Sequence, residues 1–205
     1  MKIQDEYLTE RNIERGITDV ATLTPVKSDS RLYIWQGDIT TLKCDAIVNA
    51  CNSQMLGCFS PMHACIDNFI HTYAGVELRL KMHEIMTKQG HEEETGKAKI
   101  TSGYNLPAKY VLHTVGPIIQ WKVTQEDENL LASCYKECLK LAADTGVESI
   151  AFCCLSTGVF RFPQQRAAEI ATETVMQFLK KDDRIKKVIF NVFKNEDLEI
   201  YSHLL

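Results

Sequence analysis

The sequence predicts an α/β fold in which a mostly parallel, mixed sheet is covered by helices on both faces. Short apolar segments rich in β-branched residues, such as 45–50, 110–115 and 149–155, have the length and composition of strands. A helical segment follows each of them, and strands that alternate with helices pair in parallel because the helix carries the chain back across the sheet. With 205 residues and 45% hydrophobic content, one domain can bury a substantial core.

The elements follow one another in a regular order along the chain. Residues 6–15 have an amphipathic helical pattern and the polar stretch T-P-V-K-S-D-S follows, so we expect 1–30 to be an extension packed against a main domain at 31–205. In the main domain we expect strands at 32–35, 45–50, 98–102, 110–115, 149–155 and 186–193, an acidic exposed loop at 91–96, and helices starting near Pro61 and ending at Gly75, at 76–86, at 126–143, after Pro163 and at 195–205.

Charge and hydropathy exclude several classes of function. The net charge is −4, the pI is near 5.9 and no run of Lys or Arg occurs, so the basic face used to bind nucleic acid is missing, although a nucleotide ligand remains compatible. No apolar run approaches the roughly 18 to 20 residues that span a bilayer, and the amino terminus is too polar for a signal peptide. We therefore expect a cytoplasmic protein that binds neither nucleic acid nor membrane. We also expect a monomer, although nothing in the sequence determines the oligomeric state.

The eight cysteines indicate reduced thiols rather than disulfides, because the chain is long and has no leader. Cys134 and Cys138 lie four residues apart in the apolar stripe of an expected helix, where free cysteine behaves as a small buried hydrophobe. Cys153 and Cys154 are adjacent in an expected strand and point to opposite faces. We expect both pairs to pack in the core.

A different group of thiols points to chemistry. The segment from Gly57 to His71 contains Cys58, His63 and Cys65, which could supply two thiolates and an imidazole to Zn²⁺ and leave a fourth position open for water or substrate. The spacing is not that of a zinc finger, so core packing is the alternative. Asp67 follows closely and could position or deprotonate a water molecule. Otherwise it is a surface charge or a partner of His63.

Two further segments would meet this one at the carboxyl ends of strands, where ligands bind in α/β proteins. Asp38 is either a turn or cap residue or an acceptor for an exocyclic amine such as that of adenine. Asn49 and Asn52 either satisfy backbone groups or orient sugar hydroxyls. The loop 156–162 begins with small and hydroxyl-bearing residues and precedes a helix, so its backbone amides could bind phosphate. Ordinary strand-to-helix turns have a similar composition, which is the alternative interpretation.

Five motifs follow one another along the chain: G-D-I-T at 37–40, A-I-V-N-A-C-N at 46–52, L-G-C-F-S-P-M-H-A-C-I-D-N-F-I-H-T-Y-A-G at 56–75, H-T-V-G-P at 113–117 and L-S-T-G-V-F-R-F-P at 155–163. In this order they resemble the macrodomain family, and more narrowly the zinc-containing macrodomains that act as protein-ADP-ribose hydrolases. The resemblance covers roughly residues 31 to 195. It implies a macrodomain-like three-layer α/β/α sandwich with an N-terminal helical extension.

The resemblance also implies a role for each matching residue. Asp38 would bind the adenine amine, with a backbone contact from Ile39, and Asn49 and Asn52 would lie at the distal ribose. Asp67 takes the place of the catalytic carboxylate. One Zn²⁺ per chain would be held by Cys58, His63 and Cys65, and the diphosphate and distal ribose would be wrapped by Ser156, Thr157, Gly158, Val159 and Phe160.

The implied activity is removal of ADP-ribose from mono-ADP-ribosylated proteins by hydrolysis of the glycosidic bond to a side chain, in a zinc-dependent reaction. Asp67, Asn52 and Asn49 would be the catalytic groups, and Cys65 would also contact substrate. The alternatives are a reader module that binds ADP-ribose without cleaving it, and a deacylase of O-acyl-ADP-ribose. A zinc ion that only clamps the loop is a third alternative.

Two positions depart from the general macrodomain pattern. Where many zinc-free members have a run of glycines, this chain has Gly57-Cys58-Phe59-Ser60-Pro61, which supports the zinc-containing subgroup. Cys51 replaces the small alanine that commonly lies between the two asparagines. The sequence leaves open whether Cys51 packs in the core or reaches the site.

Overall fold

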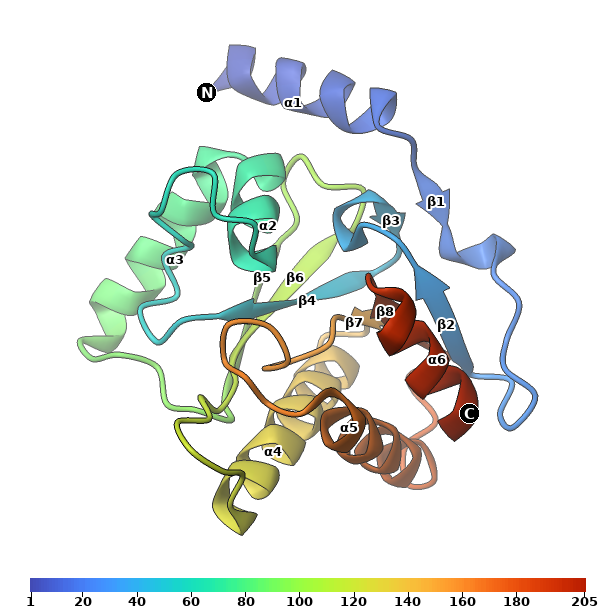
Figure 1. The fold of residues 1–205 in the computed structure, drawn as a ribbon. Coiled ribbons are helices and arrows are strands. Elements are labelled where there is room, and N and C mark those ends of the chain that lie inside the picture. Colours follow the sequence, from blue (N-terminus) through green and yellow to red (C-terminus); the bar gives the residue numbers. More distant parts are fainter.

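The centre of the computed structural model, which describes residues 1–205, is a six-stranded sheet (Figure 1). Its strands lie in the order β2 (Leu32–Gln36), β8 (Lys187–Val192), β7 (Ser149–Phe152), β4 (Ala46–Cys51), β6 (Tyr110–Val115) and β5 (Ala98–Ser102). All neighbouring strands pair in parallel except β5, which pairs antiparallel to β6. The predicted α/β class with a mixed central sheet is confirmed.

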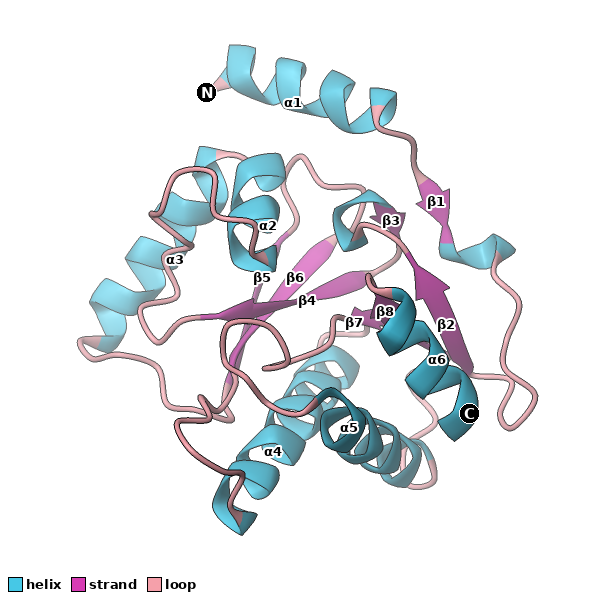
Figure 2. Cartoon of the chain, in the orientation of Figure 1, coloured by secondary structure: helices cyan, strands magenta, loops and turns pink.

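Helices cover both faces of the sheet, which gives three layers (Figure 2). One layer contains α2 (Ile66–Ala74) and α3 (Val76–Gln89), and the other contains α4 (Gln125–Asp144), α5 (Gln164–Leu179) and α6 (Asn195–Leu204). A single hydrophobic core joins the sheet to both layers, and it includes Cys134 and Cys138 at 0% exposure, as their helical spacing predicted. No helix has the length and apolarity to cross a membrane.

Local sequence signals explain the main helix boundaries. Thr124 and Asp127 form a reciprocal capping box at the start of α4, in which each side chain satisfies a backbone N–H of the other residue. Gly75 separates α2 from α3 with φ +94°, in the left-handed region that glycine adopts without strain.

The structure corrects three expectations about individual segments. Pro61 lies in a turn and not at a helix start, because α2 begins only at Ile66. The strand expected at 149–155 ends at Phe152, so Cys153 and Cys154 follow the strand rather than alternate within it, and Cys154 is only half-buried. The helix expected after Pro163 is confirmed, since α5 begins at Gln164 with Pro163 as its N-cap. In the acidic loop, Glu93 is not exposed: its carboxylate is almost fully buried and pairs with Lys99 at 2.5 Å.

The first residues form a helix that docks on the end of α2. This helix is α1 (Lys2–Glu14), and its Asn12 side chain is 2% exposed. Asn12 Nδ2 donates to the carbonyl oxygens of Tyr73 at 3.2 Å and Asn105 at 2.7 Å. After α1, the two-residue strand β1 (Thr18–Asp19) pairs in parallel with β3 (Leu42–Lys43), a small sheet that the sequence did not reveal. A buried amide therefore fixes the extension to the main domain.

We predict that Asn12→Ala loosens the extension without unfolding the main domain. The substitution leaves the Tyr73 and Asn105 carbonyls without their donor, which costs about 1 to 3 kcal/mol and should raise local opening of α1 about tenfold or more. Hydrogen exchange of the α1 amides measures this opening. Glu10→Ala, an exposed position on the same helix, is the control. Unchanged exchange in Asn12→Ala would contradict the anchoring role.

Candidate functional site

The candidate site lies at the carboxyl ends of four neighbouring parallel strands. β2, β8, β7 and β4 are adjacent in the sheet, and parallel pairing brings their carboxyl ends to one edge. The turn with Asp38 follows β2, the loop 156–162 follows β7, and the segment from Asn52 to the potential metal ligands follows β4. The sheet therefore brings together the three segments that the sequence predicted to converge.

The three soft ligands form a cluster in the loop before α2. The ligand atoms of Cys58, His63 and Cys65 all lie within 4.8 Å of one another, and Cys58 Sγ is 3.4 Å from His63 Nδ1. Asn68, on the first turn of α2, fastens this loop through hydrogen bonds from Nδ2 to the carbonyl oxygens of Ser60 at 3.1 Å and His63 at 3.0 Å. The cluster could hold a metal ion with two sulfur ligands and one nitrogen ligand.

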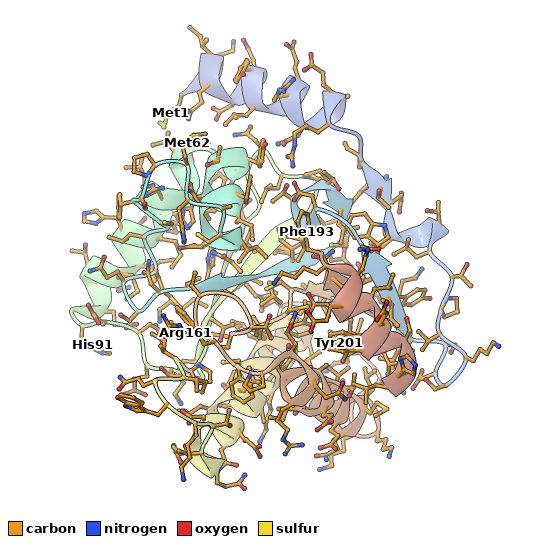
Figure 3. The ribbon with its side chains drawn as sticks, in the orientation of Figure 1. Met1, Met62, His91, Arg161, Phe193 and Tyr201 are labelled. Carbon is orange, nitrogen blue, oxygen red and sulfur yellow. The ribbon has the colours of Figure 1, made fainter.

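Gly57 allows this loop to pass close to the core. Its φ is +81°, and a Cβ there would lie 2.7 Å from Cγ of the buried His71 ring. Only glycine tolerates both the left-handed backbone and this contact. The loop therefore begins against α2 before it turns outward to the exposed Met62 (Figure 3).

Asp67 is buried on the inner face of α2. It is 4% exposed, and its Oδ1 accepts a hydrogen bond from Asn49 Nδ2 at 2.8 Å and lies 3.6 Å from His71 Nε2. Burial raises the pKa of Asp67 to about 6, while the hydrogen bond from Asn49 and the more distant Arg79 lower it. The carboxylate is thus positioned by the buried Asn49 amide, not by His63.

A histidine that sequence reasoning did not place in the site supports Asn49 from the neighbouring strand. His113 in β6 pairs with Asn49 in register, and its Nδ1 lies 3.3 Å from Asn49 Nδ2. Its other ring nitrogen is 2.9 Å from Thr101 Oγ1. Burial, together with a smaller contribution from the nearby His71 ring, lowers the pKa of His113 to about 3, so this imidazole is neutral. The available signal was a histidine within the apolar segment 110–115.

Asn52 and Cys51 occupy different environments beside this network. Asn52 is half-exposed, and its Oδ1 accepts a hydrogen bond from the Met55 amide at 3.1 Å, so the side chain shapes the turn after β4. Cys51 is 1% exposed and its thiol lies against the Asn49 carbonyl oxygen. Cys51 is therefore buried in the core, with its thiol 3.7 Å from Nδ1 of His113.

The loop after β7 presents free backbone amides. The N–H groups of Gly158, Val159 and Phe160 donate to no other group of the chain, while Phe162 N closes the loop onto the Ser156 carbonyl oxygen at 2.9 Å. Ser156 has φ +63° and Arg161 φ +61°, a left-handed backbone at both ends of the loop. Thr157 Oγ1 donates to the Cys154 carbonyl oxygen at 3.0 Å. Adjacent unpaired amides before a helix can bind an anion such as a phosphate.

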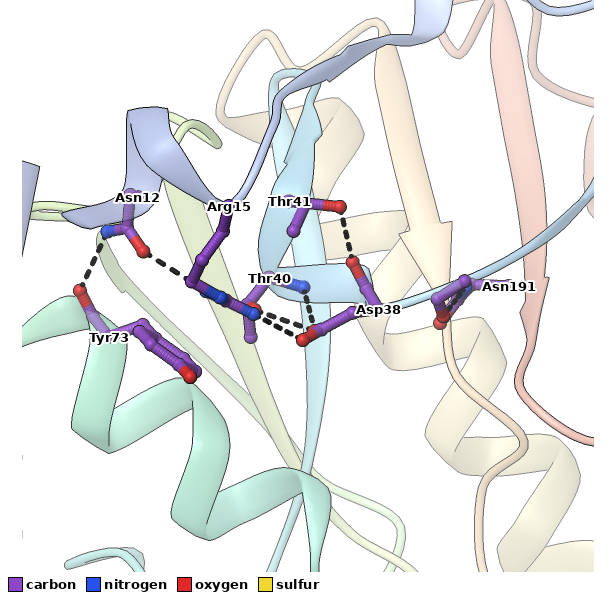
Figure 4. A network of polar contacts seen from close by, with 8 residues as sticks. Asn12, Arg15, Asp38, Thr40, Thr41, Tyr73 and Asn191 are labelled. Carbon is purple, nitrogen blue, oxygen red and sulfur yellow. Dashed lines mark hydrogen bonds and ion pairs between the residues drawn. The ribbon is translucent and has the colours of Figure 1, made fainter. Parts of the chain in front are cut away.

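Asp38 lies at the opposite end of this edge of the sheet. Its carboxylate makes more contacts within the protein than the sequence predicted. Its Oδ1 accepts hydrogen bonds from Thr40 N at 2.9 Å and Thr40 Oγ1 at 2.6 Å, which caps the 3₁₀ turn η2 (Ile39–Thr41). Its Oδ2 pairs with Arg15, just after α1 (Figure 4). Ile39 is buried at 3% exposure, so only its backbone can face a ligand. The carboxylate nevertheless keeps 37% of its side-chain surface exposed.

An exposed aromatic ring at the end of β8, the strand next to β2, was also missed. Phe193 (Figure 3) directly follows β8 and is 75% exposed. Its carbonyl oxygen accepts a hydrogen bond from Gln36 at 3.2 Å. Asn191 Nδ2 donates to the Gly37 carbonyl oxygen at 2.9 Å, which fixes the β8 end against the Asp38 turn. A solvent-facing ring at the same sheet edge as a hydrogen-bond acceptor can stack on a planar base. The sequence signal was a phenylalanine directly after an apolar strand.

Comparisons with known proteins agree on one family. Residues 48–171 match the family model described as Macro domain. The chain is 58% identical to a protein-ADP-ribose hydrolase of Treponema medium, a match that covers 100% of this chain and 79% of the relative. It is 54% identical to a protein-ADP-ribose hydrolase of Staphylococcus aureus, over 98% of this chain and 76% of the relative.

Solved structures show the same architecture. A Trypanosoma brucei macrodomain in complex with ADP-ribose superimposes with a TM-score of 0.78 at 33% identity, over 92% of this chain and 76% of that one. An Oceanobacillus iheyensis macrodomain with ADP superimposes with a TM-score of 0.75 at 38% identity, over 84% of this chain and 88% of that one.

We predict that His113 makes the folded state sensitive to acid. Unfolded histidine takes up a proton near pH 6.5, whereas His113 in the fold resists protonation down to about pH 3. Between these values the unfolded chain binds more protons, so the free energy of unfolding falls as pH is lowered, by up to about 1.4 kcal/mol per pH unit for this residue. Urea denaturation at pH 7 and pH 5 measures the effect.

Variants are needed to isolate the contribution of His113. The lowered pKa of His71 adds to the loss of stability in acid, whereas the raised pKa of Asp67 opposes it. His113→Gln keeps polar atoms near Thr101 and should lose less stability than wild type between pH 7 and pH 5. His203→Gln, at an exposed position of α6, should follow wild type. Equal losses in wild type and His113→Gln would show that His113 does not contribute.

Proposed function

The chain belongs to the macrodomain family, and we propose that it is a zinc-dependent hydrolase that removes ADP-ribose from mono-ADP-ribosylated proteins by cleaving the glycosidic bond to a side chain. Relatives at 58% and 54% identity are named protein-ADP-ribose hydrolases, and a macrodomain of the same fold is known in complex with ADP-ribose. The observation that carries the proposal is the buried Asp67, which is held by Asn49 and lies two residues after Cys65 of the Cys58, His63 and Cys65 cluster.

The ligand would lie along the strand edge. Asp38 can accept the exocyclic amine of adenine, and Phe193 can stack on the base. The free amides of Gly158, Val159 and Phe160 can bind the diphosphate. These contacts, together with Ser156 and Thr157, are remote from the scissile bond and provide binding energy that positions the distal ribose near Asn52 and Asp67.

The reaction exchanges one bond at the anomeric carbon. A water oxygen forms a bond to this carbon while the bond to the protein side chain breaks, through a state with oxocarbenium character. The leaving side chain gains a proton and the attacking water loses one. The Asp67 carboxylate accepts the water proton and stabilises the positive charge on the sugar. Asn49 holds Asp67 in place, and the Asn52 amide can orient the water or a ribose hydroxyl.

The cluster fits zinc. Its donor set is two thiols and one imidazole, which zinc prefers, and the three donor atoms are close enough to share one ion. Cys58, His63 and Cys65 would hold the ion, with Asn68 holding their loop. Bound there, zinc supplies a Lewis acid that stabilises negative charge on an oxygen atom.

We expect Asp67→Asn to abolish hydrolysis while ADP-ribose binding remains. Loss of the carboxylate should lower the rate of release from a mono-ADP-ribosylated protein by about 10² to 10⁴-fold, the range for a catalytic acid or base. Mass spectrometry should identify free ADP-ribose and unmodified protein as the wild-type products, and calorimetry should show binding by both proteins. Asp183→Asn, an exposed position far from the strand edge, is the control.

Two results would contradict this activity. Wild type that binds ADP-ribose but leaves the label on proteins of several linkage types is a reader. Wild type that releases a free acid from O-acyl-ADP-ribose, and nothing from modified protein, is a deacylase.

We expect about one zinc ion per chain, bound by the cluster. Elemental analysis and native mass spectrometry should find it in wild type and in Cys44→Ser, where a hydroxyl can replace the thiol hydrogen bond to the Ala46 carbonyl oxygen. Cys58→Ser should lose it, and a chelator should lower wild-type activity. A fully active, metal-free preparation would refute zinc dependence. If chelation instead unfolds the chain, the zinc is structural.

A further inference from the structure

We propose that Arg15, in the N-terminal extension, is a positioning residue that holds the Asp38 carboxylate and so determines the preference of the site for adenine. This inference rests on the proposed binding of ADP-ribose along the strand edge. It assigns to the extension a part in ligand recognition, although the extension precedes residues 48–171, the stretch that matches the family model.

Arg15 is held on every side by polar or aromatic contacts (Figure 4). Its Nη2 pairs with Asp38 Oδ2 and donates to Thr40 Oγ1 at 2.9 Å. Its Nη1 donates to Asn12 Oδ1 at 3.2 Å, and the guanidinium lies 3.4 Å from the centre of the Tyr73 ring. Only 15% of the side chain is exposed. A fixed guanidinium of this kind orients a carboxylate more strictly than a mobile surface lysine does.

The Asp38 carboxylate has little remaining freedom once these contacts are made. One oxygen accepts two hydrogen bonds from its own turn, at Thr40, and the other oxygen is held only by Arg15. A carboxylate offers about four acceptor positions, so at least one remains free on its exposed side. The position that faces a ligand is therefore an acceptor whose direction depends on Arg15.

An acceptor fixed in direction distinguishes two purine bases. The 6-amino group of adenine donates a hydrogen bond, whereas the 6-oxo group of hypoxanthine only accepts one and would meet Asp38 without a donor. Sites built around one hydrogen bond discriminate strongly against the analogue that cannot form it. If Arg15 is removed, Asp38 Oδ2 loses its only partner while Oδ1 stays bonded to Thr40, so the acceptor that faces the ligand is less fixed in direction, and both affinity for adenine and discrimination should fall.

The same contacts connect the adenine end of the site to the helix that carries Asp67. Tyr73, which lies under the guanidinium, belongs to α2, and Asn12 binds both Arg15 and the Tyr73 carbonyl oxygen. Arg15 is thus held in place by the docked extension and by α2 together. It touches no group at the catalytic end, so it should affect binding of the base and not the bond-breaking step.

The test compares ADP-ribose with its hypoxanthine counterpart, IDP-ribose, by calorimetry. Arg15→Ala should weaken ADP-ribose binding about tenfold, the loss of one charge-assisted contact, and should change IDP-ribose binding much less. Arg15→Lys keeps the positive charge without the planar guanidinium. Its preference for ADP-ribose over IDP-ribose should therefore lie between those of wild type and Arg15→Ala. With modified protein as substrate, Arg15→Ala should raise KM and leave kcat unchanged. Arg11→Ala, in an exposed pair with Glu14, is the control.

The ratio of the two affinities distinguishes recognition from folding. Partial unfolding of Arg15→Ala would weaken both ligands equally and leave the ratio at its wild-type value, and such an unchanged ratio would overturn the proposal. A reduced ratio in Arg15→Ala, with wild-type behaviour in Arg11→Ala, supports it. A wild-type protein that binds neither ligand would refute the proposed function itself, and the role of Arg15 with it.

Discussion

The parallel pairing of Asn49 in β4 with His113 in β6 is the constraint on which the candidate catalytic end depends. This register places the His113 ring beside the Asn49 amide, and Asn49 in turn donates to Asp67. A slip of one residue would turn Asn49 to the opposite face of the sheet, because side chains alternate along a strand. The hydrophobic packing that fixes the sheet register thus also fixes the orientation of a carboxylate on a helix.

The buried polar groups at this edge are incompletely satisfied. Four buried side-chain atoms without a hydrogen-bond partner belong to Asn49, His71 and Ser156, all near the candidate site. Each such atom costs about 1 to 3 kcal/mol if nothing pairs with it. Ser156 and Arg161 also have a left-handed backbone, which costs free energy in residues other than glycine. The unpaired atoms and the strained backbone therefore lie in a region that departs from the local preferences that favour folding. Such an arrangement suits groups that bind a polar ligand.

Most of the fold could be predicted because it follows from local patterns. The boundaries of β5 and β6 match the expected 98–102 and 110–115, where apolar residues fill short segments between turn residues. Pro61 misled because proline is compatible with both a turn and a helix start, and the loop that holds the metal-ligand cluster delays α2 to Ile66. Strand β7 ends at Phe152, earlier than expected, because the chain must turn there toward the loop 156–162. The local amino-acid composition predicts neither the late start of α2 nor the early end of β7.

The sequence identified individual residues of the candidate site, but not the contacts between residues that are far apart in the chain. Cys58, His63 and Cys65 lie close together in sequence, so their cluster followed from spacing. His113 and Arg15 act on residues 64 and 23 positions away, and only the sheet register and the docking of α1 bring them there. A histidine in a strand and an arginine at a helix end are ordinary surface or core residues until these contacts are known.

The two ends of this sheet edge differ in burial, which matches the proposed division between binding and chemistry. Asp38 and Phe193 are open to solvent, and the amides of 158–160 are free. Asp67, Asn49 and His113 are buried, where electrostatic interactions are stronger because water does not screen them. A carboxylate intended only to bind would lose affinity by such desolvation. A carboxylate that must stabilise charge developing in a transition state gains from it, since the surrounding dipoles are already oriented.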